Sequence, residues 1–259
     1  MKGKHQKKID LIYFQSLAYT IEGYISKGIR KLVLTSSGPR EGKSTITANL
    51  GRALARSGKR QVVLVDTDWI KPTLHKIFGM ENTRGLGEAL QEADPIERVR
   101  PSLNQLGMDH WVQGLLARAG AYPPLLSGRY KDCEKLFSYL KDTRIENLKL
   151  LTSGTLPYEL QDPAIAEQFR ALLDGLAQKF DIILIDSPPV ALASPAVALA
   201  ALADGVLMVV KSDGLDVEII QQAKDELVNA RANLLGVILN QVDLKESKYL
   251  SYYYSAYRR

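Results

Sequence analysis

The stretch that decides the fold is TSSGPREGKST, residues 35–45. It overlaps the end of an apolar run typical of a buried strand, KLVLTS at 31–36, and it leads into a helical pattern at 43–57. Successive backbone N–H groups at a helix N-terminus form a concave site for an anion. Gly42 lets the backbone approach such an anion closely. The spacing therefore predicts a phosphate-binding loop between a strand and a helix.

The loop carries the groups that a nucleoside triphosphate requires. We expect Lys43 to neutralise the β- and γ-phosphates and the Ser44 hydroxyl to hold Mg²⁺. One position departs from the usual G-x4-G-K pattern, because Ser37 stands where the first glycine is expected. The alternative interpretation is a Gly- and Ser-rich turn that binds no ligand. The residues predicted to contact the nucleotide are Gly38, Pro39, Arg40, Glu41, Gly42, Lys43, Ser44 and Thr45.

Three further apolar runs, each expected to form a strand, are followed or ended by polar residues. QVVLVDTD places Asp66 and Asp68 at one strand end, and DIILIDSPP places Asp186 at another. Ligands of such sheets bind at the carboxyl ends of the strands. We therefore expect Asp66 and Asp186, with Ser44, to form the metal site. Each Asp taken alone could be a cap or turn residue. Asn240, which ends LLGVILN, could equally read the edge of the base or be a turn residue.

The order of the apolar runs and helical segments predicts the fold class. Nearly continuous apolar runs are typical of strands buried on both faces of a parallel sheet. Strands that alternate with helices indicate a doubly wound, mainly parallel α/β sheet with helices on both faces. The other expected strands are 61–66, 148–154, 181–186, 205–210 and 234–240, and the expected helices are 10–27, 43–57, 162–179, 194–203 and 216–231.

The expected domain organisation has three parts. Residues 1–244 form one nucleotide-binding domain, which begins with the helix at 10–27. Residues 91–147 hold many charges and turn signals with weak periodicity, and we interpret them as a helical insertion or lid. Residues 245–259 form a separate tail.

Composition excludes several classes of protein. The chain has 259 residues, of which 46% are apolar and 24% charged, as in soluble globular proteins. A single cysteine, Cys133, excludes an internal disulfide framework and favours a reducing compartment. The three His and this Cys show no metal-ligand spacing. No run has the length of a membrane span, and the N-terminus lacks a signal peptide, so we expect a cytoplasmic protein.

The net charge of +5 lies at the two ends of the chain. Residues 1–30 hold six Lys/Arg and two acids (+4), residues 245–259 hold four Lys/Arg and one acid (+3), and the rest sums to −2. This distribution argues against a nucleic-acid partner, which requires a basic face. The basic ends could contact an anionic membrane or an acidic partner, or they could be solubilising tails.

The last eleven residues, YLSYYYSAYRR, hold five of the chain's twelve tyrosines. An even distribution would place only about half a tyrosine there. These candidate phosphoacceptors are Tyr249, Tyr252, Tyr253, Tyr254 and Tyr257. The alternative is an aromatic patch that docks on a partner or at a membrane interface. A tail of this composition is expected to be mobile and accessible to the active site of a neighbouring molecule.

Together these motifs resemble the bacterial tyrosine kinases of capsule and exopolysaccharide synthesis, of the cytoplasmic autokinase type. The similarity rests on the phosphate loop TSSGPREGKST, on LVDTDWIKPTLHKIFG and on ILIDSPPV, in the same order and spacing as in that family. It continues through ADGVLMVV and LLGVILNQVD. It covers about 30–90 and 148–259 and leaves 91–147 unmatched.

The resemblance implies a P-loop ATPase fold related to the septum-site and partition ATPases. It also implies ATP, Mg²⁺ and a membrane-embedded activator from the polysaccharide export machinery, which would place the chain at the inner face of the plasma membrane. The tyrosine cluster would be phosphorylated in trans. In such a reaction Lys43 stabilises the transferred phosphoryl group, and Asp66 or Asp68 accepts the tyrosine proton.

Some positions depart from that family's pattern. Ile70 stands where an Arg is usual, and Arg40 where a Gly is common. The Glu and two Arg that join subunits of the family into a ring correspond to Ile12, Gln15 and Ala18, which puts a homo-oligomeric ring in question. These departures favour an alternative, a non-kinase ATP-binding regulator or scaffold of the same export machinery.

A third hypothesis, a partition-like ATPase associated with DNA, is disfavoured. The signature Lys of that group falls at Gly38, and the core has no net basic charge.

Overall fold

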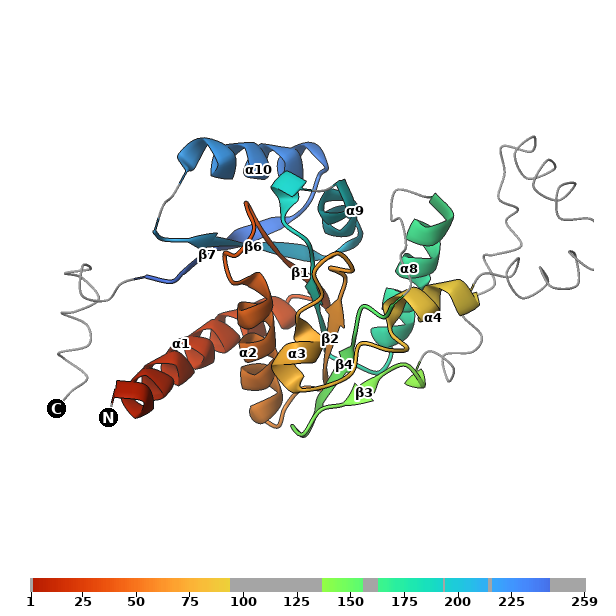
Figure 1. The fold of residues 1–259 in the computed structure, drawn as a ribbon, viewed down its shortest axis with the longest axis horizontal. Coiled ribbons are helices and arrows are strands. Elements are labelled where there is room, and N and C mark those ends of the chain that lie inside the picture. The colour runs from red at the N-terminus through yellow and green to blue at the C-terminus, as the bar shows by residue number, and fades with distance from the viewer. Residues whose placement is uncertain (1, 94–136, 156–162, 193, 214–215, 243–259) are drawn as a thin grey trace, which may run out of the picture.

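The computed structural model describes residues 2–93, 137–155, 163–192, 194–213 and 216–242. They contain a seven-stranded sheet with the order β3-β4-β2-β5-β1-β6-β7 (Figure 1). Every neighbouring pair is parallel except β3 and β4 at one edge. The strands are β1 (Lys31–Ser36), β2 (Val62–Asp66), β3 (Lys141–Asp142), β4 (Leu148–Leu151), β5 (Ile182–Asp186), β6 (Gly205–Lys211) and β7 (Leu234–Asn240).

Helices cover both faces of the sheet (Figure 1). Residues of α1, α2 and α3 belong to the apolar core on one face, and residues of α4, α8, α9 and α10 belong to the core on the other. The predicted fold class is confirmed. The helices are α1 (Lys2–Ile25), α2 (Lys43–Arg56), α3 (Leu74–Phe78), α4 (Leu86–Ala93), α8 (Pro163–Leu176), α9 (Ser194–Leu202), α10 (Val217–Asn229) and the short 3₁₀ turn η2 (Val190–Leu192).

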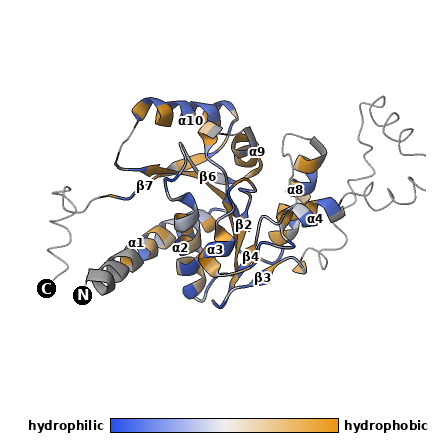
Figure 2. Ribbon diagram, viewed as in Figure 1, coloured by the Kyte–Doolittle hydropathy of each residue, from blue (hydrophilic) through white to orange (hydrophobic). Residues whose placement is uncertain are grey.

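The apolar strands produce this layered arrangement. Successive residues of a strand point to opposite faces, so Leu32 contributes to the core beneath α1 and α2, and Val33 to the core beneath α8 and α9. Both side chains are fully buried. Figure 2 shows hydrophobic residues along the central strands and hydrophilic residues on the outer sides of the helices. The hydrophobic effect therefore fixes the central strands between two helical layers.

The N-terminal helix is longer than the sequence predicted. The expected start was residue 10, whereas α1 begins at Lys2. The prediction followed apolar spacing, and the apolar residues of α1 that are buried in the core are Ala18, Ile21 and Ile25. The first turns carry no apolar stripe that could have marked them, and the N-terminal end of α1 projects from the layered body (Figure 1).

The range 91–147 is not wholly a helical insertion. Its first residues complete α4, which starts earlier at Leu86, and Lys141–Asp142 form the edge strand β3. Such a short strand shows no alternation, which explains why the sequence did not reveal it. Residues 94–136 lie outside the described residues, so the predicted lid stays a prediction there. The tail at 245–259, with its five tyrosines, also lies outside them.

In the part of the chain that the structure describes, no helix has both the length and the apolar character needed to cross a bilayer.

Candidate active site

The predicted phosphate loop connects β1 to α2 through two left-handed residues. Arg40 has φ 65° and Gly42 has φ 89°. A Cβ at position 42 would lie 2.2 Å from Nδ2 of Asn240, so any other residue would have a strained left-handed backbone and would displace the Asn240 side chain. Helix α2 begins at the next residue, Lys43. The first backbone N–H groups of α2 therefore open into the loop, as an anion site requires.

Glu41 closes the loop on itself. The Ser37 hydroxyl lies 2.8 Å from Oε1 of Glu41, and the backbone N–H of Gly38 lies 2.8 Å from Oε2. The departure from the usual pattern at Ser37 thus has a structural use, because glycine has no hydroxyl to donate. The loop pattern predicts Glu41 to be a nucleotide contact and does not reveal this internal hydrogen bond.

The end of β7 holds the loop from the other side. Asn240 Nδ2 donates to the carbonyl oxygen of Glu41 at 2.9 Å, and Gln241 Nε2 donates to that of Arg40 at 3.2 Å. Asn240 therefore lies at the site, as predicted, but its amide nitrogen binds the loop. Its role in reading a base edge stays a prediction. Gln241 lies within the matched stretch LLGVILNQVD, but it was not predicted as a site residue because it lies one residue beyond the apolar run.

Lys43 and Asp68 form an ion pair at the start of α2. Nζ of Lys43 lies 3.2 Å from Oδ2 of Asp68, and the two side chains are only 12% and 7% exposed. The other carboxylate oxygen of Asp68 accepts from the backbone N–H of Lys71 at 3.0 Å. The structure thus brings together two residues, far apart in the chain, that the sequence assigned to one site.

Asp66 fixes the segment that follows β2. Its Oδ2 accepts from the backbone N–H groups of Thr73 (3.1 Å) and Leu74 (3.0 Å), and its Oδ1 accepts from that of Asp68 (3.2 Å). Burial raises the pKa of Asp66 to about 6, although these hydrogen bonds oppose the rise. Asp66 therefore positions the turn that carries Asp68.

Asp186, like Asp66, is fully buried. It is paired in register with Asp66 across β5 and β2. Burial, with a further contribution from the charge of Asp66, raises the pKa of Asp186 to about 8, while Lys43 and a hydrogen bond from Ser44 act in the opposite direction. Thr47 Oγ1 lies 3.4 Å from Oδ1 of Asp186. Oδ2 finds no hydrogen-bond partner among the described residues.

These residues fit a magnesium ion bound together with phosphates. The orphaned carboxylate oxygen of Asp186 and the hydroxyl of Ser44 are hard oxygen ligands, and Mg²⁺ typically takes one or two protein groups plus phosphate oxygens. Within the described ranges no three His, Cys, Asp or Glu side chains cluster as a metal cage. The ion would therefore need the nucleotide to complete its coordination.

Of the positions that depart from the kinase pattern, Arg40 lies in the phosphate loop, whereas Ile70 and the three ring positions are not part of this cluster. Ile70, where an Arg was expected, is 59% exposed. On α1, Ile12 and Gln15 are exposed, whereas Ala18 is buried against the core. Only two of the three ring positions thus face outward, and neither carries a charge.

Comparison with known proteins places the chain in a family. Residues 32–256 match the CobQ/CobB/MinD/ParA nucleotide binding domain. Tyrosine-protein kinase YwqD of Bacillus subtilis (strain 168) is 26% identical over 248 residues, which cover 95% of this chain and 87% of YwqD. Tyrosine-protein kinase CpsD of Streptococcus pneumoniae serotype 4 is 26% identical over 250 residues, covering 94% and 92%.

Solved structures show the same similarity. The crystal structure of the chimerical protein CapA2B2 superposes with a TM-score of 0.65 at 27% identity, over 88% of this chain and 83% of that one. The VpsO kinase domain has a TM-score of 0.67 at 20% identity, over 93% and 98%, and so bears on the fold alone. The resemblance to bacterial tyrosine kinases that the motifs indicated is confirmed, and the chain belongs to the CobQ/CobB/MinD/ParA family of nucleotide-binding proteins.

Proposed function

We propose that this chain is an ATP-dependent protein-tyrosine kinase that phosphorylates the C-terminal tyrosine cluster of a neighbouring copy. The observation that carries the proposal is the convergence of Lys43, Asp68 and Asp186 at the N-terminus of α2. The kinase names of relatives that match nearly the whole chain support it.

The geometry suggests how the residues act. The loop amides and the first turn of α2 bind the β- and γ-phosphates, and Lys43 neutralises their charge. Magnesium, held by Ser44 and Asp186, would further neutralise the phosphate oxygens. The tyrosine oxygen attacks the γ-phosphorus, the bond from that phosphorus to the β–γ bridging oxygen breaks, and ADP leaves.

Asp68 is the better candidate for the base that accepts the tyrosine proton. The sequence left the choice between Asp66 and Asp68 open. Both carboxylate oxygens of Asp66 accept backbone hydrogen bonds, whereas Oδ2 of Asp68 is paired with the Lys43 ammonium. When Lys43 turns to the phosphates, that oxygen becomes able to accept the proton. A phenol has a pKa of about 10, so its proton needs such a nearby carboxylate.

We place this activity in capsule or exopolysaccharide synthesis and export. A membrane-embedded co-polymerase would be the activating partner, and the chain would act at the inner face of the plasma membrane. The resemblance supports this context, and the basic ends of the chain fit an anionic membrane surface. A homo-oligomer would bring one tail to the active site of the next copy.

The direct test is phosphotyrosine mapping. The purified chain is incubated with Mg-ATP, with and without the co-polymerase, and the peptides that contain Tyr249 to Tyr257 are analysed by mass spectrometry. We expect phosphate on the cluster and none in Lys43→Ala. An unmodified tail, even with the co-polymerase present, would reject the kinase proposal.

The second candidate is a non-kinase ATP-binding regulator or scaffold of the same machinery. The uncharged, exposed Ile12, Gln15 and Ile70 favour it, because the kinase pattern has charged residues at these positions. It predicts ATP binding without tail phosphate. It also predicts that polysaccharide production is unchanged when the five tail tyrosines become phenylalanine.

A further inference from the structure

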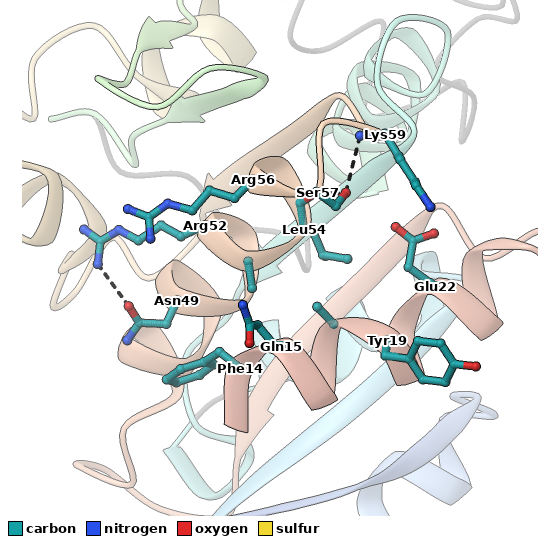
Figure 3. A pocket seen from close by; sticks show the side chains of 12 residues that line it. Phe14, Gln15, Tyr19, Glu22, Asn49, Arg52, Leu54, Arg56, Ser57 and Lys59 are labelled. Atoms are coloured by element: carbon teal, nitrogen blue, oxygen red, sulfur yellow. Dashed lines mark hydrogen bonds between the residues drawn. The ribbon is translucent and has the colours of Figure 1, made fainter. Parts of the chain in front are cut away.

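A groove of about 850 Å³ runs between α1 and α2 (Figure 3), and no residue of the phosphate loop lines it. Its apolar lining comes from both helices and includes Phe14, Ala18, Ala53 and Leu54. Arg52, Arg56 and Lys59 provide its positive charge. An aromatic ring can lie on such a lining while an attached anion meets the cations.

Two arginines one helical turn apart form the cationic wall. The side chains of Arg52 and Arg56 extend from α2 in the same direction (Figure 3). Burial, and then the charge of Arg56, lower the pKa of Arg52. No ion pair joins either Arg to a carboxylate within the described residues. The wall therefore carries positive charge that an anion would stabilise.

Arg52 is held in place by its neighbours. Its guanidinium lies 4.7 Å from the centre of the Phe78 ring and donates to Asn49 Oδ1 at 3.0 Å. Arg56 is exposed and makes no such contact among the described residues. Across the groove, Glu22 is already paired with Arg60 at 2.9 Å. Glu22, the acidic residue of the lining, therefore does not neutralise Arg52 and Arg56.

The C-terminal tail of the chain contains five tyrosines, which phosphorylation would make anionic. The tail follows β7, and Tyr24 of α1 donates to the carbonyl oxygen of Leu235 in β7 at 3.4 Å, so α1 flanks the strand from which the tail departs. Residues 243–259 number 17, which could span up to about 56 Å when extended. That reach permits contact with the groove of the same molecule or of a neighbour.

The charge of the tail determines whether its unmodified or its phosphorylated form can bind in the groove. Without phosphate, residues 245–259 have a net charge of +3 and are repelled by Arg52 and Arg56. Each phosphate adds about −1.5 to −2 charges, so two phosphates make the tail neutral or negative. A guanidinium group can donate two parallel hydrogen bonds to the oxygens of one phosphate. Arg52 and Arg56 are suited to this binding because neither is paired with a carboxylate among the described residues.

We propose that the groove between α1 and α2 binds phosphorylated tyrosines of the C-terminal cluster. The inference rests on the proposed kinase function for the source of the phosphate. The groove would retain the modified tail away from the active site, so that phosphorylation moves the tail from one site to another. The negative charge of the modified tail then stabilises the bound state.

The test is direct binding of synthetic peptides to the full-length chain after phosphatase treatment. One peptide has the sequence of residues 245–259 with phosphate on Tyr252, Tyr253 and Tyr254, and its control is unmodified. Fluorescence anisotropy is measured for the wild type, for Arg56→Gln and Arg56→Lys, and for Lys224→Gln, an exposed cation of α10. Thermal melting confirms that each variant folds.

We expect the phosphopeptide to bind at least tenfold more tightly than the unmodified peptide. Arg56→Gln should weaken binding about tenfold, Arg56→Lys less, and Lys224→Gln not at all. Equal binding of both peptides, or the same loss in Lys224→Gln, overturns the proposal. So does binding of phosphatidylserine vesicles that depends on Arg56 without binding of the phosphopeptide. Because these peptides are made synthetically, a failure of the kinase proposal appears only in the phosphotyrosine map.

Discussion

Ser37 and Glu41, four residues apart, form a hydrogen-bonded pair inside the phosphate loop, with the Ser37 hydroxyl 2.8 and 3.0 Å from the two carboxylate oxygens. The same carboxylate accepts from the backbone N–H of Gly38. The loop therefore keeps its shape through side-chain contacts at the position where a glycine is usual. Preorganised loops bind with less loss of conformational entropy.

We expect Glu41→Ala to weaken ATP binding about tenfold, because the loop must then be ordered when the nucleotide binds. Glu41→Gln, which keeps one acceptor oxygen for Ser37 or Gly38, should lose less. Calorimetric titration with Mg-ATP measures both. Glu146→Ala, at an exposed turn residue, is the matched control. Unchanged affinity in Glu41→Ala would show that the pair has no role in binding.

Asn240→Ala tests which of two roles that residue has. If its main role is to hold the carbonyl of Glu41, the substitution weakens ATP and GTP by the same factor, about threefold to tenfold for one lost hydrogen bond. If Asn240 also reads the base, the ratio of the two affinities changes. We expect the first result from the observed contact. Competition of both nucleotides against a fluorescent analogue measures the ratio.

The central sheet was predictable from sequence because its signals are local. The apolar runs that became β1 and β7 were predicted with the correct ends, and the structure brings Lys43, Asp68 and Asp186 near one another, as their positions at the ends of such runs indicated. Parallel strands bring their carboxyl ends to one edge, so residues that end such runs converge. Neither result required knowledge of side-chain contacts.

What the sequence did not reveal depends on contacts between distant segments. Gln241 binds the carbonyl of Arg40, 201 residues earlier, and the hydrogen bonds from Thr73 and Leu74 to Asp66 depend on the path of an irregular turn. The edge strand β3 has two residues and exists because it pairs with β4. No periodicity or motif encodes such pairings, since they arise only when the chain has folded.

Because Lys43 and Asp68 form an ion pair, we expect the Lys43→Ala variant to lose stability as well as activity. Lys43→Ala leaves a buried carboxylate without its cation, which should lower the free energy of unfolding by about 1–3 kcal/mol in the absence of nucleotide. Adding Asp68→Asn to Lys43→Ala should restore part of that loss. Urea unfolding of the two single variants and the double variant measures the coupling. Strictly additive effects would show that the pair does not contribute.

Asp186 predicts a pH-dependent stability. Its pKa is raised from 3.8 to about 8, so over that range the folded chain holds a proton that the unfolded chain has released. The free energy of unfolding of the nucleotide-free chain should therefore fall as the pH rises from 3.8 towards 8. Asp186→Asn cannot ionise, so we expect its melting temperature to exceed that of the wild type by several degrees at the upper end of this range and by less at the lower end.

Without nucleotide, Asp186→Asn should melt at a higher temperature than the wild type. Magnesium nucleotide should reverse that order, because Mg²⁺ favours the ionised carboxylate of Asp186. Addition of Mg-ADP is expected to raise the melting temperature of the wild type and to leave that of Asp186→Asn nearly unchanged. Asp213→Asn, an exposed acid near the end of β6, should behave as the wild type in both experiments. If the melting temperatures of the wild type and of Asp186→Asn run parallel between pH 3.8 and pH 8, the pKa of Asp186 is not raised in the folded chain.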